Sequence, residues 1–373
     1  MMPELLRVLL IAVPATLLSV TVAAQPVRIG IPERGNLQHM SFWIAEGAGL
    51  FKAEGLDVEI VVADVPNQSG MLLMQGRVDV ALLQPPAYLG LIAAQHPFVL
   101  FASLLADDPI NLVVRADVAA KLGLDFSASL AERLTAIKGL RVGVAPEPPR
   151  RLRALFAHAG MNADRDVQIV IRRGDQQIEA LTSGSVDALY AHTPYLEDAL
   201  VRLRAVMLVN QSSGEVAPLA NNQIHSLGAA RSYVAAHPEV ISKVTRAIAR
   251  AQQLLHRDTP AAIAALGNAG ITAPTPRHLE TIVNLYRPAV PKTPHVSAAA
   301  IERNAALYPA RPTMPDFTKV RAADFVAPSF AEQASLQDYA QPSVELVGRE
   351  FGEGVCAVGA DGQRPDPRCQ LDR

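Results

Sequence analysis

Cysteine is nearly absent from this chain of 373 residues. Its two cysteines, Cys356 and Cys369, both lie in a tail rich in glycine, proline and aspartate. Their spacing is unlike that of a metal site, so the sequence predicts no metal centre. Two alternatives stay open for the pair. In an oxidising compartment they close a small loop as a disulfide that pins the tail, or they remain two free thiols.

The chain also has little excess of either charge, because 34 Lys and Arg residues nearly balance 36 Asp and Glu residues. The net charge of −2 gives no reason to expect nucleic acid as a partner. The sequence has no His-Glu-x-x-His, no Gly-x-Ser-x-Gly and no phosphate-binding glycine loop. We therefore predict neither an enzyme nor a cofactor. With 50% hydrophobic residues, the chain can fill the cores of two or three domains.

The first residues are typical of an export signal. Arg7 precedes a largely apolar stretch at residues 8–20, and small residues at 22–24 provide a cleavage site before Gln25. The alternative is a membrane anchor, but the apolar run is at the short limit for spanning a bilayer and contains Pro14. No cysteine stands at the cleavage point to carry lipid. We expect a soluble protein in the periplasm, with a signal peptide at residues 1–24.

A short pattern occurs twice in the chain. Residues 76–86 and 184–194 share a glycine, a Val-Asp pair and a proline in the same register. In each copy the pattern predicts the end of an amphipathic helix, a short apolar strand and a sharp turn at the proline. Ligands of open α/β sheets bind at the carboxyl ends of strands. The turns at Pro86 and Pro194 are therefore expected to face each other across a cleft between two similar lobes.

Strand and helix patterns alternate through both predicted lobes. Strands are expected at residues 27–31, 56–62, 98–105, 140–144 and 167–171. One helix is expected at about residues 40–54. Alternating βαβ units favour right-handed crossovers and mostly parallel sheets. The predicted fold class is α/β, with two doubly wound lobes joined by two crossing segments that form a hinge.

After residue 210 the pattern changes to a long helix at about residues 238–256, followed by short helices between frequent prolines. This region cannot form another sheet, so we expect it to wrap back over the first lobe. The predicted division of the chain is a signal peptide at 1–24, the first lobe at 25–110, the second lobe at 111–222, a return to the first lobe at 223–310 and a C-terminal extension at 311–373.

Four motifs, in this order over roughly residues 27–266, resemble the family of exported solute-binding proteins for nitrate, sulfonates, taurine and thiamine precursors. They are the run at residues 42–58, the two Gly-x-Val-Asp repeats, the strand Lys138-Gly139-Leu140-Arg141-Val142-Gly143-Val144, and His237-Pro238-Glu239-Val240. The resemblance implies a type II periplasmic-binding-protein fold. It also implies a monomer that captures a small molecule between its lobes and delivers it to an ABC permease in the inner membrane.

Two other functions stay open. A sensory ligand-binding subunit would share the cleft and differ only in its membrane partner. Relatives that build the thiamine pyrimidine share this fold, but they are intracellular and carry a cysteine-rich motif. This chain has a predicted export signal and cysteines only in its tail. These features favour a binding protein over an enzyme.

The identity of the ligand is open at this point. The segment 36–39 followed by Trp43 is similar to a segment of the pyrimidine-precursor branch, although the glycine-rich sequence of that branch is absent. In the sulfonate and nitrate branches of the family that this chain resembles, backbone N–H groups at the start of the first helix of the second lobe are exposed as donors to an anion. The matching loop here, residues 145–151, contains three prolines that have no N–H to donate. Side chains of Arg150 or Arg151 are an alternative means of holding a carboxylate.

Candidate ligand-binding residues come mainly from loops at strand ends. In the first lobe they are Asn36, His39, Phe42, Trp43, Gln68, Ser69, Gln84, Pro85 and Tyr88. In the second lobe they are Glu147, Arg150, Arg173, Asp175, His192, Thr193 and Tyr195.

Trp43 is either a flat wall for ring stacking or a core residue, and His39 is either a ligand or a capping histidine. Asp79 and Asp187 precede their strands and are expected to be structural. Arg202, Arg204, Arg246 and Arg250 are expected on solvated faces.

Overall fold

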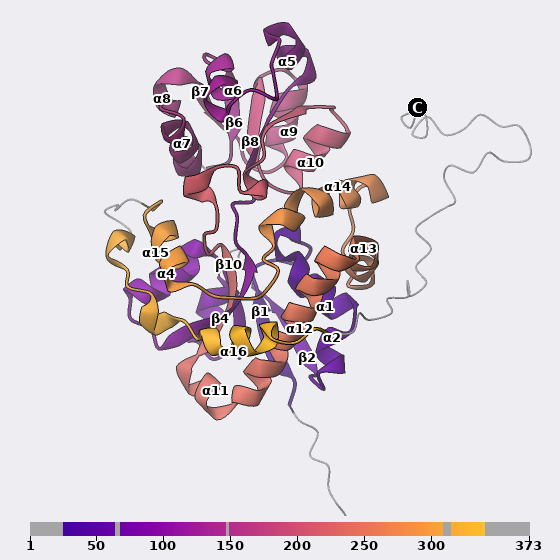
Figure 1. Ribbon diagram of the computed structural model, residues 1–373, viewed down its shortest axis with the longest axis vertical. Helices are drawn as coiled ribbons and strands as arrows, with labels where there is room; N and C mark the ends of the chain where they lie inside the picture. Colours follow the sequence, from indigo (N-terminus) through magenta and orange to yellow (C-terminus); the bar gives the residue numbers. More distant parts are fainter. Residues whose placement is uncertain (1–24, 64–67, 147–148, 309–314, 340–373) are drawn as a thin grey trace, which may run out of the picture.

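The computed structural model describes residues 25–63, 68–146, 149–308 and 315–339, which form two α/β lobes (Figure 1). Each lobe is built on a five-stranded sheet, which confirms the predicted fold class. In spatial order, the strands of lobe 1 are β2 (Val58–Val62), β1 (Val27–Ile31), β3 (Val80–Leu83), β10 (His225–Ala230) and β4 (Phe98–Leu105). Those of lobe 2 are β7 (Gln168–Ile171), β6 (Arg141–Val144), β8 (Ala188–Ala191), β5 (Asn111–Val114) and β9 (Val206–Val209).

The two sheets share one topology, and both are mixed. Strand β1 pairs in parallel with β2 and β3, just as β6 pairs in parallel with β7 and β8. Strands β10 and β5 run antiparallel to both of their neighbours. Four strands of each sheet therefore run in the same direction and one runs against them, so the sheets are mostly, but not wholly, parallel. Strands β10 and β5 each follow a crossing from the other lobe. They therefore enter their sheet at the carboxyl ends of the parallel strands and run in the opposite direction to them.

Helices cover both faces of each sheet. In lobe 1 they are α1 (Met40–Gly47), α2 (Leu50–Ala53), α3 (Ser69–Met74), α4 (Pro85–Ala93), α11 (Arg231–Ala236), α12 (Pro238–Arg257), α13 (Thr259–Asn268), α14 (Pro276–Tyr286), α15 (Ala298–Ala305) and α16 (Pro328–Ser335). In lobe 2 they are α5 (Ala116–Leu122), α6 (Leu130–Ala136), α7 (Pro149–His158), α8 (Ala163–Asp166), α9 (Gln176–Thr182) and α10 (Tyr195–Val201). Short 3-10 turns are η1 (Leu37–His39), η2 (Gln211–Ser213), η3 (Ala217–Leu219), η4 (Arg287–Ala289), η5 (Phe317–Lys319) and η6 (Ala323–Phe325).

In each lobe, apolar side chains form a core on both faces of the sheet. In lobe 1, one face packs against α12 through residues such as Ile241 and Ile248, and the other packs against α4 and η6 through Leu89 and Phe325. Burial of such side chains contributes about 1.5–3 kcal/mol each. The chain after residue 314 belongs to this packing, because Val326 bridges Leu100 of β4.

The same ion pair ties two neighbouring parallel strands together in each lobe, β1 to β3 and β6 to β8. Arg28 of β1 donates from Nη2 to Asp79 Oδ1 over 2.7 Å, and its backbone N–H donates to Asp79 Oδ2 over 2.9 Å. Arg141 of β6 makes the same two bonds to Asp187, at 2.7 and 3.0 Å. Both aspartates lie just before their strands. Their predicted structural role is therefore confirmed, and the repeat extends to side-chain contacts.

The expected single helix at residues 40–54 is interrupted. The chain forms α1 and then α2, with Gly49 between them at φ 65°, a left-handed conformation that favours glycine. Gly47 in the last turn of α1 lies against the backbone of α13, so that a β-carbon there would be 1.8 Å from the carbonyl oxygen of Ala265. The two glycines thus let the chain turn and approach α13 closely.

We expect Gly47→Ala to lower the free energy of unfolding by about 1–3 kcal/mol, because backbone atoms of α13 cannot rotate away from the added methyl group. The measurement is urea denaturation of both proteins. Gly90 of α4 is a matched control, since no atom lies within 4 Å of a β-carbon built there. Gly90→Ala should raise stability by about 0.5–1 kcal/mol through helix propensity. Destabilisation of similar size in both variants would contradict the packing argument.

Arg246 and Arg250 of α12 do not lie on a solvated face as expected. Arg246 Nε is 2.9 Å from Glu54 Oε2, and Arg250 Nη1 is 3.0 Å from Glu54 Oε1. The Glu54 side chain is only 12% exposed. Helical spacing places the two arginines one turn apart, where both reach the carboxylate that follows α2. They join α12 to the N-terminal part of lobe 1.

Helix α14 of the return segment contacts lobe 2. It packs against α10, where His278 Nε2 lies 3.6 Å from Asp198 Oδ1. Nearby, the Glu197 carboxyl group is fully buried beside the hydroxyl groups of Tyr286 and Thr193. Burial raises the pKa of Glu197 to about 7. The lobes are therefore joined by this helix contact as well as by the two crossing segments at residues 106–110 and 210–224.

Several predictions concern residues outside those that the structure describes. They are the signal peptide at residues 1–24 and the disulfide between Cys356 and Cys369, and both remain predictions. Across residues 25–63, 68–146, 149–308 and 315–339, no helix has the length and apolar character needed to cross a bilayer.

Candidate functional site

A cavity of about 480 Å³ lies between the lobes. From lobe 1 and its adjoining segments it is lined by Glu33, Asn36, Gln38, Gln84, Pro85, Pro86, Ile224, His225 and Tyr308. From lobe 2 and the first crossing it is lined by Pro109, Ile110, Ala145, Pro146, Arg150, Arg151, Arg173 and His192. The loops after β1, β3, β6, β7 and β8 all reach it. Because these are the carboxyl ends of strands in both sheets, the cavity has the usual position of a ligand site in open α/β folds.

The lobe 1 wall is built by local capping interactions. Asn36 caps η1, where its Oδ1 accepts from the backbone N–H of Gln38 over 2.9 Å, and its Nδ2 donates to Glu33 Oε1 over 2.6 Å. Helix α4 begins directly after β3 at Pro85, whose fixed φ suits the first helical position. The amides of Gln38 and Gln84 are thereby held at the cavity wall.

The lobe 2 wall carries three arginines. Arg151 is buried and its Nε lies 2.5 Å from Oδ2 of Asp108, a residue of the first crossing that is 1% exposed. Burial raises the pKa of Asp108, and the charge of Arg151 acts in the opposite direction. Arg150 lies with its guanidinium carbon 3.7 Å from the ring centre of Tyr308. Arg173 lies in the loop after β7, and among the described residues it forms no ion pair.

Burial favours the neutral form of two histidines of the wall. Burial lowers the pKa of His192, whose Nδ1 is 2.6 Å from the carbonyl oxygen of Thr193. Burial also lowers the pKa of His225 well below its usual value. The ring of His225 lies tilted at 54° to that of His39, with ring centres 4.6 Å apart. The cavity therefore offers one imidazole group from each lobe, His225 from lobe 1 and His192 from lobe 2, and guanidinium groups from lobe 2.

Six of the predicted site residues line the cavity together: Asn36, Gln84, Pro85, Arg150, Arg173 and His192. His39 lies behind this wall, fully buried, and burial lowers its pKa to about 3. Neither of its ring nitrogens has a hydrogen-bond partner among the described residues. His39 thus forms the second layer behind His225, not the surface of the cavity.

Five predicted residues of lobe 1 lie elsewhere. Phe42 and Trp43 are fully buried in the core of lobe 1, where Trp43 Nε1 donates to the carbonyl oxygen of Asn36 over 3.1 Å. Ser69 is buried and its Oγ donates to the carbonyl oxygen of Leu82. Tyr88 donates to the carbonyl oxygen of Gln223 and accepts from Asn304. Gln68 precedes α3 and does not line the cavity.

Three predicted residues of lobe 2 lie beside the cavity without lining it. The Tyr195 ring centre is 6.2 Å from that of His192, and its hydroxyl group lies over Gly174. Thr193 is buried. Asp175 is exposed just before α9. Glu147 is outside the residues that the structure describes.

Sequence reasoning missed several lining residues. They are Glu33, Gln38, Pro109, Ile110, Ala145, Pro146, Ile224, His225 and Tyr308. Most are neighbours of predicted residues in the same loops, so the loops were a sufficient signal for them. Tyr308 follows α15 in the return segment and His225 is the first residue of β10, and no repeated pattern marks either of them.

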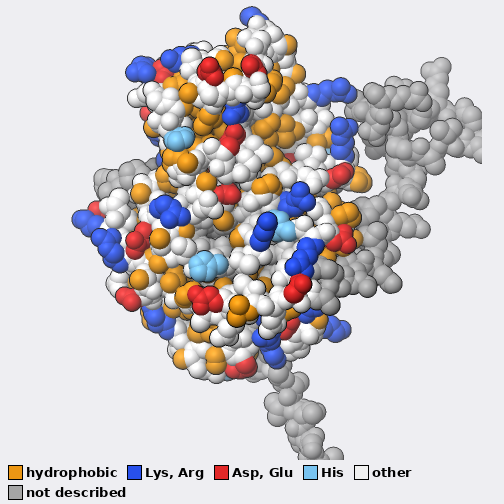
Figure 2. Space-filling model, in the orientation of Figure 1, with side chains coloured by type: hydrophobic (Ala, Val, Ile, Leu, Met, Phe, Trp, Pro, Cys, Tyr) orange, Lys and Arg blue, Asp and Glu red, His pale blue; other side chains and the backbone are white. Residues whose placement is uncertain are grey.

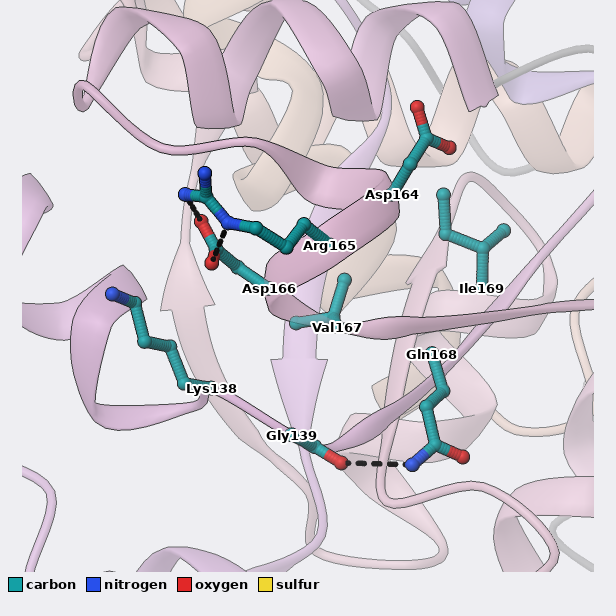
Figure 3. A pocket seen from close by; sticks show the side chains of 8 residues that line it. All are labelled: Lys138, Gly139, Asp164, Arg165, Asp166, Val167, Gln168 and Ile169. Carbon is teal, nitrogen blue, oxygen red and sulfur yellow. Dashed lines mark hydrogen bonds and ion pairs between the residues drawn. The ribbon is translucent and has the colours of Figure 1, made fainter.

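A second cavity, of about 600 Å³, lies on lobe 2 and is lined by Lys138, Gly139 and residues 164–169 (Figure 3). Three of its charged groups have partners, since Arg165 Nε is 3.0 Å from Asp166 Oδ1 and Asp164 pairs with Arg153. It lies where β6 and β7 begin, at the opposite end from the interlobe cavity. We assign it no function.

Acidic and basic side chains are interspersed over the face of both lobes seen in Figure 2.

The paired sheets, the two crossings and the interlobe cavity define a two-lobed α/β binding-protein fold of type II. The chain belongs to the NMT1-like family, whose model matches residues 24–267. The family resemblance drawn from the sequence motifs is thereby confirmed. In the described part of the chain, no group of three or more His, Cys, Asp or Glu residues is placed to hold a metal ion.

Solved structures with this fold include two kinds of periplasmic binding protein. The alkanesulfonate-binding protein SsuA from Xanthomonas axonopodis pv. citri, bound to MOPS, is 19% identical with a TM-score of 0.57, over 82% of this chain and 99% of that chain. The nitrate-binding protein NrtA from Synechocystis PCC 6803 is 13% identical with a TM-score of 0.58, over 83% of this chain and 88% of that chain. Identities this low show a common fold and nothing more specific.

A curated relative is an enzyme. The 4-amino-5-hydroxymethyl-2-methylpyrimidine phosphate synthase of Aspergillus parasiticus is 25% identical over 237 residues. The match covers 60% of this chain and 65% of the synthase, so the chain spans somewhat less than two thirds of that relative.

Proposed function

We propose that this protein is an exported solute-binding protein that captures a small organic molecule between its lobes and delivers it to an ABC importer. The observation that carries the proposal is the cavity of about 480 Å³, to which the strand ends of both lobes contribute. A cavity of this size is in the range of small-molecule sites. Only a ligand that touches both walls gains affinity from closure of the lobes.

Capture then follows from the hinge. Two crossing segments permit opening and closure while restricting twist. A ligand that contacts Gln84 in lobe 1 and Arg173 in lobe 2 binds the closed state better than the open state, and it shifts the population towards closure by that difference in affinity. A micromolar dissociation constant needs about −8 kcal/mol. Several hydrogen bonds and one charge pair supply this after ordering costs.

Export and delivery are the finer parts of this proposal. The N-terminal sequence pattern supports release into the periplasm, where a permease of the inner membrane would receive the closed form. A sensory subunit would use the same cleft with a receptor as its partner. An uptake assay separates the two, because only the transport role predicts that cells lacking the gene lose accumulation of the identified ligand.

The biosynthetic alternative is supported by the synthase relative alone. Relatives that build the thiamine pyrimidine carry a cysteine-rich motif. This chain has cysteines only at positions 356 and 369. The wall of the cavity instead offers arginine, histidine and amide groups, which suit reversible binding. We therefore favour a binding protein.

The test is a thermal-shift screen of the purified protein with pyrimidines, aromatic and aliphatic acids, sulfonates and nitrate. A true ligand should raise stability by about 2.7 kcal/mol at one hundred times its dissociation constant. Small-angle scattering should then show a smaller radius of gyration. Conversion of the compound into a product, or stabilisation without any compaction, would contradict capture by closure.

A further inference from the structure

We infer that the captured molecule is an organic carboxylate with an apolar body, and that Tyr308 orients Arg150 to receive its carboxylate group. The inference rests on the proposed function and names the class of ligand for the same cavity. It depends on three features of the walls: their charge, their apolar surface and the contact between Arg150 and Tyr308.

Arg150, Arg151 and Arg173 bring positive charge to the lobe 2 wall. The charge of Arg151 is matched by Asp108 at 2.5 Å. Arg173 in the next loop has no ion pair among the described residues. On the opposite wall the acidic group of Glu33 accepts a hydrogen bond from Asn36. A ligand whose anionic group faces lobe 2 would accept charge-assisted hydrogen bonds from the guanidinium groups of this wall.

Much of the remaining wall is aliphatic. Four prolines line it, namely Pro85, Pro86, Pro109 and Pro146, together with Ile110, Ile224 and Ala145. An inorganic anion would leave most of the 480 Å³ filled with water against these surfaces. An apolar body removes them from water and gains about 25 cal/mol for each Å² buried. The cavity therefore suits an acid with a substantial hydrocarbon part.

Tyr308 crosses from the return segment to hold the arginines of lobe 2. The Arg150 guanidinium carbon is 3.7 Å from its ring centre, and Arg151 Nη2 donates to its hydroxyl group over 3.4 Å. The ring itself is buried and rests edge-on against Phe317, with ring centres 6.1 Å apart. A guanidinium over an aromatic face keeps its N–H groups available at its edge. Tyr308 is thus a positioning residue.

A planar acceptor suits these donors better than a tetrahedral one. The guanidinium fork matches the two oxygens of a carboxylate. A sulfonate has a third oxygen that needs a donor from another direction. In this loop Pro146 and Pro149 have no N–H to supply one. We therefore assign a carboxylate rather than a sulfonate to the site.

The experiment uses calorimetric titration with matched compounds of the same carbon skeleton. The probes are carboxylates of two to eight carbons and benzoate, each with its primary amide and its sulfonate, plus nitrate. Carboxylates of the longer skeletons should bind at least about tenfold more tightly than their amides, as expected for hydrogen bonds to a charged group. Acetate and nitrate should bind more weakly than hexanoate or benzoate.

Variants connect binding to the named side chains. Arg173→Gln should weaken carboxylate binding by about tenfold or more, whereas Arg172→Gln, in the same loop but not lining the cavity, should change it by less than about twofold. Tyr308→Leu should weaken binding by about threefold to tenfold, and Tyr308→Phe, which keeps the aromatic face, should retain most of it. Melting temperatures without ligand check that each variant folds.

The outcomes separate the two proposals. If amides or sulfonates bind more tightly than carboxylates and still close the lobes, the ligand class is wrong while capture stands. Equal weakening by Arg172→Gln and Arg173→Gln, or equal affinities in Tyr308→Leu and Tyr308→Phe, would remove the roles given to Arg173 and Tyr308. If no compound of any class binds, capture and ligand class are both contradicted.

Discussion

Asp108→Asn should lower the free energy of unfolding by about 3–5 kcal/mol, the usual cost of leaving one member of a buried ion pair without its partner. Asp108 is 1% exposed and its carboxylate faces Arg151 at 2.5 Å. Asparagine preserves the shape of the side chain and can still accept from the backbone N–H of Ile110, as Asp108 Oδ1 does over 3.1 Å. The loss is therefore assigned to the buried charge of Arg151. Urea denaturation at pH 7 measures it.

Two controls accompany this prediction. Asp117→Asn removes the acidic member of an exposed pair with Arg115, whose side chains are 65% and 27% exposed, and it should cost less than about 1 kcal/mol. The double variant Asp108→Asn with Arg151→Gln removes both buried charges and should recover part of the loss. A double variant less stable than Asp108→Asn alone would show that the uncompensated charge is not the cause.

The plan of each lobe is predictable from the sequence because strand patterns and turns are local. The apolar run at residues 98–105 is found as β4, and the long helix α12 begins at the expected Pro238. The direction of β5 and β10 was not predictable from such patterns. It depends on where each crossing enters its sheet, which is a contact between distant parts of the chain.

The candidate site divides in the same way. Loops that follow strands brought Asn36, Gln84, Arg150, Arg173 and His192 to one cavity, since the carboxyl ends of neighbouring strands meet at one edge of a sheet. Aromatic residues near these loops were harder to assign, because burial in the core and exposure to a ligand produce the same sequence pattern.

Tyr308 illustrates what the sequence leaves out. It follows α15 in the proline-rich return segment and reaches the cavity only because that segment folds back over lobe 1. Its contact with Arg150 joins residues from different lobes. No spacing or periodicity marks such a pair, whereas the equivalent Arg28–Asp79 and Arg141–Asp187 pairs accompany a repeat that is visible in the sequence.

The contact between α10 and α14 makes stability depend on pH through one carboxyl group. Burial raises the pKa of Glu197 from 4.5 to about 7. The folded protein therefore keeps a proton on Glu197 between those values while the unfolded chain releases it, so stability from this group is present at low pH and is lost as pH rises through about 7. The full change is about 3 kcal/mol.

Glu197→Gln should accordingly be more stable than the wild type at pH 8, by up to about 3 kcal/mol, and nearly equal to it at pH 5. Glutamine has a similar shape and carries no charge that burial between α10 and α14 can penalise. Buried histidines such as His39 titrate in both proteins, so the difference between variant and wild type isolates position 197. Glu179→Gln, on the exposed side of α9, is the control and should give the same small difference at both pH values. A stability difference for Glu197→Gln that does not change between pH 5 and pH 8 would show that Glu197 keeps the same protonation in the folded and unfolded protein.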